Sequence, residues 1–337
     1  MRQKLLNNHI NIFKEALDKT DRINGPPVRL ILDPNKKVKP VAHCKPFDVP
    51  FNLRKYMDTE ISQAITAGIL SPCNETTAWC HQLFPVPKPG RDEVRIVSDF
   101  RRLNSAMLRP HFPTESSSQM LRHIEPDAKW FATLDMVSAY HQVSVHPEDR
   151  HLLTVISQQG RFQYNTLSQG ICSASDLFNY LSDGTVRYDS NWQSIQKNMD
   201  DTLFAAKSLD ELELMLTAFF EFCLRKNIKL KGSKFYISQE VEFSGVRISS
   251  EELGRKDCVF IRPTNKKECQ VWVGMVSSLA SWFPASSLSC PIIRKATAGS
   301  TKLVWSEDME REYLQTRKLM KENLKKLGLS WAKLKLS

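Results

Sequence analysis

Residues 131–143 read Phe-Ala-Thr-Leu-Asp-Met-Val-Ser-Ala-Tyr-His-Gln-Val, and this stretch decides the fold. Its first part, with Trp130 before it, is apolar and rich in residues that favour extended structure. We therefore predict a strand over 130–135 that ends in the carboxylate of Asp135. An acid at the end of an apolar strand places a negative charge at the edge of a sheet, where a site can form.

A second group of acids lies in a predicted hairpin. Ile195 to Ala205 reads as a strand, a tight turn and a strand, with Asp200-Asp201 at the turn. Adjacent carboxylates repel one another, so a fold tolerates them where they stay solvated or hold cations. If this hairpin lies beside the strand that ends at Asp135, three carboxylates meet at one sheet edge and suit Mg²⁺. An Asp-Asp pair alone indicates only a solvated turn, so this interpretation depends on its context.

Length and charge limit the class of protein. The chain has 337 residues, more than one compact core usually organises, so we expect two or three lobes. Its formal net charge of +10 suits a polyanionic partner such as nucleic acid, although a merely soluble basic protein would show the same excess. The eight cysteines form no CxxC pair, which favours reduced thiols. We expect no membrane span and no secretory signal.

Helices and hairpins alternate along the chain without a regular β-α-β rhythm. This order favours an α+β fold of antiparallel strands backed by helices and argues against a doubly wound sheet. Helical segments are predicted at 51–69, 174–186, 208–223 and 265–284, and 302–337 is amphipathic and basic. Strands are predicted at 28–50, 94–97, 130–135, 151–166 as a hairpin, 195–205, 234–237 and 241–248.

The stretch 131–143 resembles the first catalytic block of reverse transcriptases, and most closely that of gypsy-type LTR retrotransposons. Asn198-Met-Asp-Asp201 resembles their second catalytic block. Six further stretches resemble blocks of the same family in the same order: Gly68 to Pro72, Arg95 to Asn104, Tyr164 to Gly170, Phe243 to Gly245, Lys266 to Pro284 and Val304 to Glu307. The resemblance runs from about residue 28 to about residue 325.

The resemblance implies a right-hand polymerase with an antiparallel palm sheet. The implied domains are an N-terminal extension at 1–27, fingers at 28–130 with a hairpin at 150–166, a palm at 131–247, a thumb at 248–290, and the start of a connection segment at 291–337 without RNase H.

The resemblance also implies roles for individual residues. Asp135, Asp200 and Asp201, with the backbone carbonyl of Met136, would hold two Mg²⁺ ions, a role that Mn²⁺ could also fill. The incoming dNTP would be contacted by Lys88, Arg95, Tyr140 and Gln169, with the tyrosine excluding a ribose 2′-hydroxyl. Lys234 would be a general acid for pyrophosphate, and the primer grip would comprise Phe243, Ser244 and Gly245.

Taken singly, several of these residues have simpler interpretations. Lys88 and Arg95 could form a solvated hairpin face, Tyr140 could be a core tyrosine, and Lys234 could be a surface lysine. The sequence also departs from the family's pattern. Asn198 replaces an aromatic residue, Ser168-Gln169 replaces Pro-Phe, Ser175-Asp176 replaces a proline and puts an acid near the expected template path, and Ala280-Ser281 replaces two arginines.

The implied reaction is templated addition of dNTPs to a primer 3′-hydroxyl, with RNA or DNA as template. Expected partners are a primed template, dNTPs, and the RNase H, integrase and protease domains of the same polyprotein. The expected location is intracellular: cytoplasmic, in virus-like particles, or nuclear. Three other functions remain open: a decayed or domesticated copy that only binds nucleic acid, an RNA-dependent RNA polymerase with the same palm, and a silent partner subunit.

Overall fold

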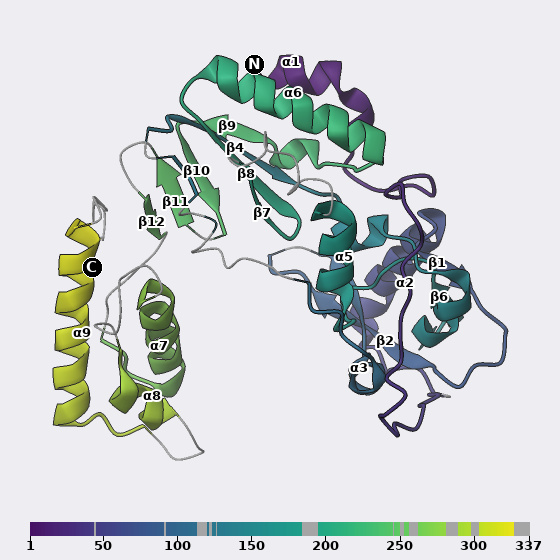
Figure 1. The fold of residues 1–337 in the computed structure, drawn as a ribbon. Helices are drawn as coiled ribbons and strands as arrows, with labels where there is room; N and C mark the ends of the chain where they lie inside the picture. The colour runs from purple at the N-terminus through teal and green to yellow at the C-terminus, as the bar shows by residue number, and fades with distance from the viewer. Residues whose placement is uncertain are drawn as a thin grey trace. The chain divides into compact units, whose positions relative to one another are not determined.

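A computed structural model describes most of the chain (Figure 1). The described residues are 1–43, 45–90, 92–112, 120, 123–125, 127–183, 195–244, 246–249, 253–255, 262–280, 289–297 and 303–326. The chain divides into two compact units. The first comprises Met1–Thr114, Leu134–Thr202 and Glu213–Phe235, and the second comprises Glu115–Thr133, Leu203–Leu212 and Tyr236–Ser337.

The first unit contains both helices and strands. Its α-helices are α1 (Arg2–Asn8), α2 (Phe51–Thr66), α3 (Arg101–Ala106) and α5 (Ala174–Asp183), and its strands are β1 (Leu70–Pro72), β2 (His81–Pro87), β3 (Val94–Ser98), β5 (Thr154–Ser157), β6 (Gly160–Tyr164) and β7 (Ile195–Asn198). Short 3-10 turns cover Ile10–Ile12, Ala139–Gln142, Pro147–Leu153 and Gly232–Lys234. Three elements contain residues of both units: β4 (Trp130–Asp135), β8 (Asp201–Ala206) and α6 (Leu209–Lys226).

Helix α2 begins where its sequence predicts but ends at Thr66, three residues before the predicted end at residue 69. It begins after Pro50 and buries Met57, Ile61 and Ala64, which recur at helical spacing. Gly68 follows the helix with φ of +66°, a left-handed conformation in which glycine commonly ends a helix. Helix α6 begins with the predicted capping box, because the backbone N–H of Glu211 donates to the Ser208 hydroxyl at 3.2 Å.

A five-stranded sheet in the first unit has the order β1-β6-β5-β2-β3. Strands β2 and β3 form the predicted hairpin with Val86 opposite Arg95, and β5 and β6 form the second one. Strands β2 and β5 are parallel, whereas the other described pairs in this sheet are antiparallel.

The prediction of strands over residues 28–50 is wrong. Within the described part of that segment the structure contains only isolated bridges, including Val28 with Val145 and Ala42 with Cys80. Pro40, Pro46 and Pro50 supply no N–H, so the segment cannot sustain a ladder. Its apolar residues are nevertheless buried, as Val28 and Val49 illustrate.

The adjacency on which the sequence interpretation depends is present. A four-stranded sheet has the order β7-β8-β4-β9, so the strand that ends at Asp135 lies beside the strand that begins at Asp201. Strand β9 (Tyr236–Ser238) starts later than the predicted 234–237, because Gly232–Lys234 forms a 3-10 turn. The predicted strand 241–248 is instead a hairpin of β10 (Glu240–Phe243) and β11 (Val246–Ser249), since Ser244 turns the chain at φ of +51°.

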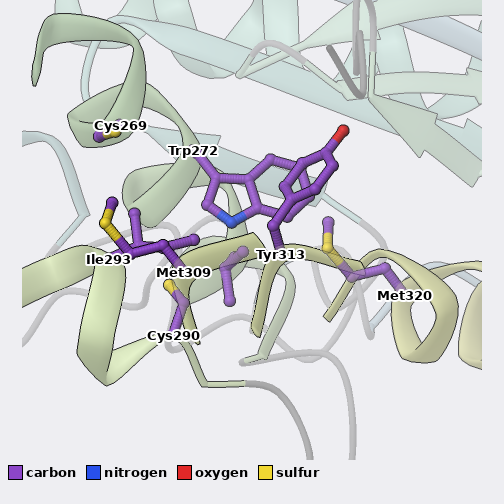
Figure 2. Packing of buried hydrophobic residues seen from close by; sticks show 8 residues of the cluster. Cys269, Trp272, Cys290, Ile293, Met309, Tyr313 and Met320 are labelled. Atoms are coloured by element: carbon purple, nitrogen blue, oxygen red, sulfur yellow. The ribbon is translucent and has the colours of Figure 1, made fainter. Parts of the chain in front are cut away.

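The second unit contains strand β12 (Leu253–Arg255) and three helices. These helices are α7 (Lys266–Ala280), α8 (Pro291–Thr297) and α9 (Glu307–Lys326). They enclose an apolar cluster in which the ring centroids of Trp272 and Tyr313 lie 4.7 Å apart (Figure 2). The buried members of the cluster are Cys269, Trp272, Val276, Cys290, Ile293, Met309, Tyr313 and Met320.

The predicted α+β class is confirmed, with mainly antiparallel sheets and packed helices. The boundaries of fingers, palm and thumb stay predictions. Among the described helices, none has the length and apolar character needed to cross a bilayer.

A buried glutamine fixes the chain just after β4. Gln142 is 0% exposed, and its amide nitrogen donates to the carbonyl oxygens of Val137 at 2.8 Å and Lys229 at 2.9 Å. Its amide oxygen accepts from the Lys229 N–H at 2.7 Å. One side chain therefore satisfies three backbone groups and joins the loop after Asp135 to the segment before β9.

We predict that Gln142→Leu lowers the free energy of unfolding by about 3 kcal/mol, because the buried Val137 carbonyl and Lys229 N–H lose their partner and the Lys229 carbonyl keeps only the Val137 N–H. Urea denaturation would measure the loss. Gln158→Leu, at an exposed position in the β5–β6 turn, is the matched control and should change stability by less than about 0.5 kcal/mol. Equal stability of the two variants would contradict this role for Gln142.

Candidate active site

The backbone brings the two acidic segments together. Met136 N–H donates to the Asp200 carbonyl oxygen at 3.0 Å, so the residue after Asp135 is bonded directly to the β7–β8 turn. On its other side the Asp135 carbonyl accepts from the Lys231 N–H at 2.8 Å. Asp135 is thus held between two neighbouring segments and is only 7% exposed.

The β7–β8 turn presents the other two acids. Met199 has φ of +57°, a left-handed conformation uncommon for a residue with a side chain. Asp200 completes this turn and Asp201 begins β8, and both are exposed. The predicted turn position is confirmed for Asp200, whereas Asp201 already belongs to the strand.

The three carboxyl groups interact electrostatically. Partial burial raises the pKa of Asp201 to about 6, and the negative charges of Asp200 and Asp135 add to the shift. The pKa of Asp200 is also raised, by partial burial and by the charge of Asp135.

Lys234 partly neutralises this charge. Its ammonium forms an ion pair with the Asp135 carboxylate, and this hydrogen bond raises the pKa of Lys234. The lysine side chain is 56% exposed, so it also reaches solvent. The structure therefore brings the predicted general acid next to the predicted metal ligands.

The oxygen donors of Asp135, Asp200 and Asp201 are of the type that a divalent cation prefers, but their side chains are not arranged as a metal site. Across the described residues, no three His, Cys, Asp or Glu side chains converge as a ready metal site. The Asp135 carboxylate is bound by Lys234 instead. However, the Asp135 carboxylate is close enough to add to the raised pKa values of Asp200 and Asp201, and three neighbouring oxygen donors are the kind of set that Mg²⁺ binds.

One groove of about 1820 Å³ collects half of the predicted site residues. Its wall is formed by residues of the first unit, many of them from helix α2. Among the predicted site residues, those that line it are Lys88, Arg95, Asp135, Met136, Gln169 and Asp200. The basic pair therefore shares a wall with two of the acids.

Lys88 and Arg95 lie on the β2–β3 hairpin. Lys88 directly follows β2 and its ammonium lies 2.8 Å from the Glu93 carboxylate. Arg95 is exposed on β3. A lysine that is already paired and an exposed arginine can both turn toward a phosphate group, since Arg offers a planar fork and Lys a point charge.

Tyr140 lies against the acidic turn rather than in the lining of the groove. Its hydroxyl lies 3.1 Å from the Ser175 hydroxyl and 4.0 Å from the Met199 sulfur. Its ring meets Phe178 edge-on, with centroids 5.6 Å apart. Tyr140 is therefore fixed by α5 next to Asp200.

The predicted primer-grip residues lie in the second unit. Phe243 is buried and packs in a cluster with Phe131, Leu203 and Ile248. Ser244 forms the β10–β11 turn, and Gly245 lies outside the described residues. The Phe243 side chain is thus a core residue, so only the turn could contact a ligand.

The acid that replaces part of the family's proline motif is buried and paired. Asp176 is 4% exposed and accepts hydrogen bonds from Arg109 Nε at 2.7 Å and the Phe112 N–H at 2.9 Å. The expectation of an unhelpful acid on the template path is therefore wrong, because an ion pair neutralises Asp176. Of Ala280-Ser281, which replace two arginines of the family's pattern, Ser281 lies outside the described residues.

The sequence interpretation missed Lys231 and the basic residues of α2. Lys231 lines the groove and bonds the Asp135 backbone, and Arg54 and Lys55 line the groove from α2. The run Lys229-Leu-Lys-Gly-Ser-Lys234 was a usable signal, because it holds three lysines in six residues.

His141 also lines the groove, as a neutral side chain. Its Nδ1 lies 3.2 Å from the Thr166 hydroxyl, and its ring stacks on Tyr164 with an interplanar angle of 10°. Burial lowers the pKa of His141 to about 4, and the nearby positive charge of Arg22 contributes to the shift.

Comparison with known proteins agrees with this geometry. Residues 86–248 match the family described as reverse transcriptase (RNA-dependent DNA polymerase). The chain is 24% identical to the Gag-Pol polyprotein of Walleye dermal sarcoma virus over 81% of its own length and 16% of that protein. It is 24% identical to the Pol polyprotein from transposon opus of Drosophila melanogaster over 70% of its length and 24% of that protein. The chain thus spans about a quarter or less of these relatives.

Solved structures share the fold. A foamy viral protease-reverse transcriptase in complex with double-stranded DNA has a TM-score of 0.78 at 17% identity, covering 95% of this chain and 56% of that one. The foamy viral enzyme in complex with an RNA/DNA hybrid has a TM-score of 0.76 at 18% identity, covering 94% of this chain and 43% of that one.

The pKa of His141 predicts acid sensitivity of the fold. A histidine whose pKa is lower in the folded protein than in the unfolded chain binds fewer protons when folded. Its contribution to stability is therefore complete above pH 6.5 and is lost as the pH falls toward 4. Between pH 7 and pH 4.5, the free energy of unfolding should fall by about 2 kcal/mol less in His141→Gln than in the native chain. Urea denaturation at both pH values tests this, and parallel losses in the two proteins would refute it.

Proposed function

We propose that the chain is an RNA-directed DNA polymerase, on the premise that its residues 86–248 match the family described as reverse transcriptase (RNA-dependent DNA polymerase). The proposed reaction adds a dNTP to a primer 3′-hydroxyl and releases pyrophosphate. The single observation that carries the proposal is the position of Asp135 beside the Asp200 turn, in one groove with Lys88 and Arg95.

The acids have the role of cation ligands in this proposal. Asp135, Asp200 and Asp201, with the Met136 carbonyl, would hold two divalent cations, Mg²⁺ or Mn²⁺. Bound there, such ions lower the pKa of the primer hydroxyl and stabilise the charge that develops on pyrophosphate. Lys234 holds a proton at its Nζ beside Asp135, where it could be donated to the leaving group.

The basic residues and the tyrosine select and orient the nucleotide. Lys88 and Arg95 would bind the triphosphate, and Gln169 would contact the nucleotide from the same wall of the groove. Tyr140 would exclude a ribose 2′-hydroxyl with its ring, which α5 holds in place through Ser175 and Phe178.

The proposed partners follow from the relatives. Two of the similar foamy viral structures contain double-stranded DNA or an RNA/DNA hybrid, which supports a primed template as the partner here. The Gag-Pol relatives are longer polyproteins, which supports protease, RNase H and integrase as neighbouring activities. The net charge of +10 suits such a polyanionic substrate.

Primer extension tests the activity. With Mg²⁺, dNTPs and a primed RNA or DNA template, the native chain should extend the primer, and Asp200→Asn should reduce the rate at least about 100-fold, because several kcal/mol of transition-state stabilisation are lost. Asp210→Asn, an exposed acid in the first turn of α6, is the matched control and should keep the native rate.

Absence of extension by the native chain on both templates would favour a decayed copy that only binds nucleic acid. Equal rates for Asp200→Asn and the native chain would show that the signal comes from another site.

Tyr140→Val should raise the use of ribonucleotides relative to deoxynucleotides by about tenfold or more, because the ring that occupies the 2′ position is removed. Tyr140→Phe, which keeps the ring and loses only the hydroxyl bonded to Ser175, is the control and should stay selective. Single-nucleotide incorporation with matched dNTP and rNTP pairs measures the ratio. A native chain that already prefers ribonucleotides would indicate an RNA polymerase instead.

A further inference from the structure

The first unit has a second cavity, of about 490 Å³, that shares no lining residue with the groove. It lies between the C-terminal end of α2, strand β1 and the segments around residues 19–22 and 144–150. Its lining consists of Lys19, Arg22, Ile65, Gly68, Leu70, Ser71, Pro72, Ser144, Arg150 and Asn165. The volume is within the range of about 300–1,000 Å³ that is usual for ligand sites.

The lining carries three positive charges and no carboxylate. Arg22 donates to the backbone carbonyls of Asp18, Asp21 and Ala67 at 2.6–3.0 Å, and Arg150 Nε donates to the Val145 carbonyl at 3.1 Å. These acceptors are neutral. Among the ion pairs of the described residues, none joins Lys19, Arg22 or Arg150 to a carboxylate.

The acids closest in sequence are bound to other cations. Asp18 and Asp21 pair with the Lys14 ammonium at 2.5 and 2.7 Å. Glu148 and Asp149 pair with Arg29 at 3.2 and 2.7 Å. The positive charge at the cavity is therefore only partly offset. Burial lowers the pKa of Arg22, whereas the negative charges of Asp21 and Asp18 raise it.

The backbone at the end of α2 is shaped to admit these side chains. At Gly68 a Cβ atom would come within 3.0 Å of Lys19 Cγ and 3.4 Å of Arg22 Nη2. The C-terminal end of α2 carries a partial negative charge that would repel an anion. This repulsion is weak here because the carbonyls of Ala67 and Gly68 already accept hydrogen bonds from Arg22 and Asn165. Asn165 also donates to the Ser71 hydroxyl at 2.6 Å, which leaves that hydroxyl's own proton for a ligand.

We propose that this cavity is a phosphate-binding site separate from the polymerase groove. Lys19, Arg22 and Arg150 supply positive charge and the Ser71 hydroxyl supplies a donor in a concave wall, and such groups bind phosphate oxygens. The cavity is larger than one phosphate needs, so it takes either a compact polyphosphate or successive phosphates of a nucleic-acid strand. The proposal does not depend on polymerase activity.

Titration calorimetry of the full chain with sodium tripolyphosphate, without added metal, tests the site. Lys19→Gln/Arg150→Gln should weaken binding at least tenfold. The matched control is Lys37→Gln/Lys39→Gln, which removes the same charge from exposed positions outside the cavity and should bind as the native chain does. Repeating the titration in Lys88→Gln/Arg95→Gln removes binding in the groove and should leave the cavity's affinity intact.

A single-stranded oligonucleotide titrated at several salt concentrations separates the two sources of phosphate. If the cavity binds a strand, the cavity variant should lose oligonucleotide affinity, and the salt slope should fall by about 0.7 for each phosphate that is no longer neutralised. Unchanged oligonucleotide binding with weakened tripolyphosphate binding identifies a free polyphosphate. No tripolyphosphate binding by the native chain, or equal weakening in both double variants, overturns the proposal. Lys19→Gln is also tested alone, because it changes an exposed residue and should keep the fold even if Arg150→Gln does not.

Discussion

Repulsion among three carboxylates is the constraint on which the rest of the first unit depends. Asp135, Asp200 and Asp201 lie at the meeting ends of two adjacent strands, and partial burial together with the charges of neighbouring carboxylates raises the pKa values of the latter two. Backbone hydrogen bonds from Met136 and Lys231 fix the segments against this repulsion. Gln142 anchors the loop that follows, and Lys234 supplies the opposing charge. The local structure is therefore organised to hold like charges together, which a cation would stabilise.

Other charged groups in the same unit have a mainly structural role. The buried carboxylates of Asp149 and Asp176 bind Arg29 and Arg109, which lie far away in sequence, and each also accepts a backbone N–H. Such pairs join segments without leaving a net charge. Arg22 and Arg150 differ because their described hydrogen bonds go to neutral groups. Neutral acceptors thus leave the positive charge of these two arginines without a paired carboxylate.

The sequence predicted the parts of the fold that local patterns determine. Helix α2, the capping box of α6 and the hairpin that presents Asp200 all follow from spacing, caps and turns. It failed where tertiary contacts decide. The segment 28–50 is rich in β-formers, but its prolines cannot take part in a ladder. Asp176 was misjudged because its partner, Arg109, is distant in sequence. The sequence predicted α2 as a helix, but the periodicity of its apolar residues does not show which of its exposed residues line the groove.

The core of the three helices in the second unit has a chemical consequence of its own. Four of its eight buried members carry sulfur: Cys269, Cys290, Met309 and Met320. Burial raises the pKa of Cys290 to about 11, so its thiol stays protonated and unreactive while the helices are packed. Transient opening would expose the thioethers to peroxide, and a sulfoxide oxygen could not return to an apolar interior. Oxidation would thus hold these helices open until the sulfoxide is reduced.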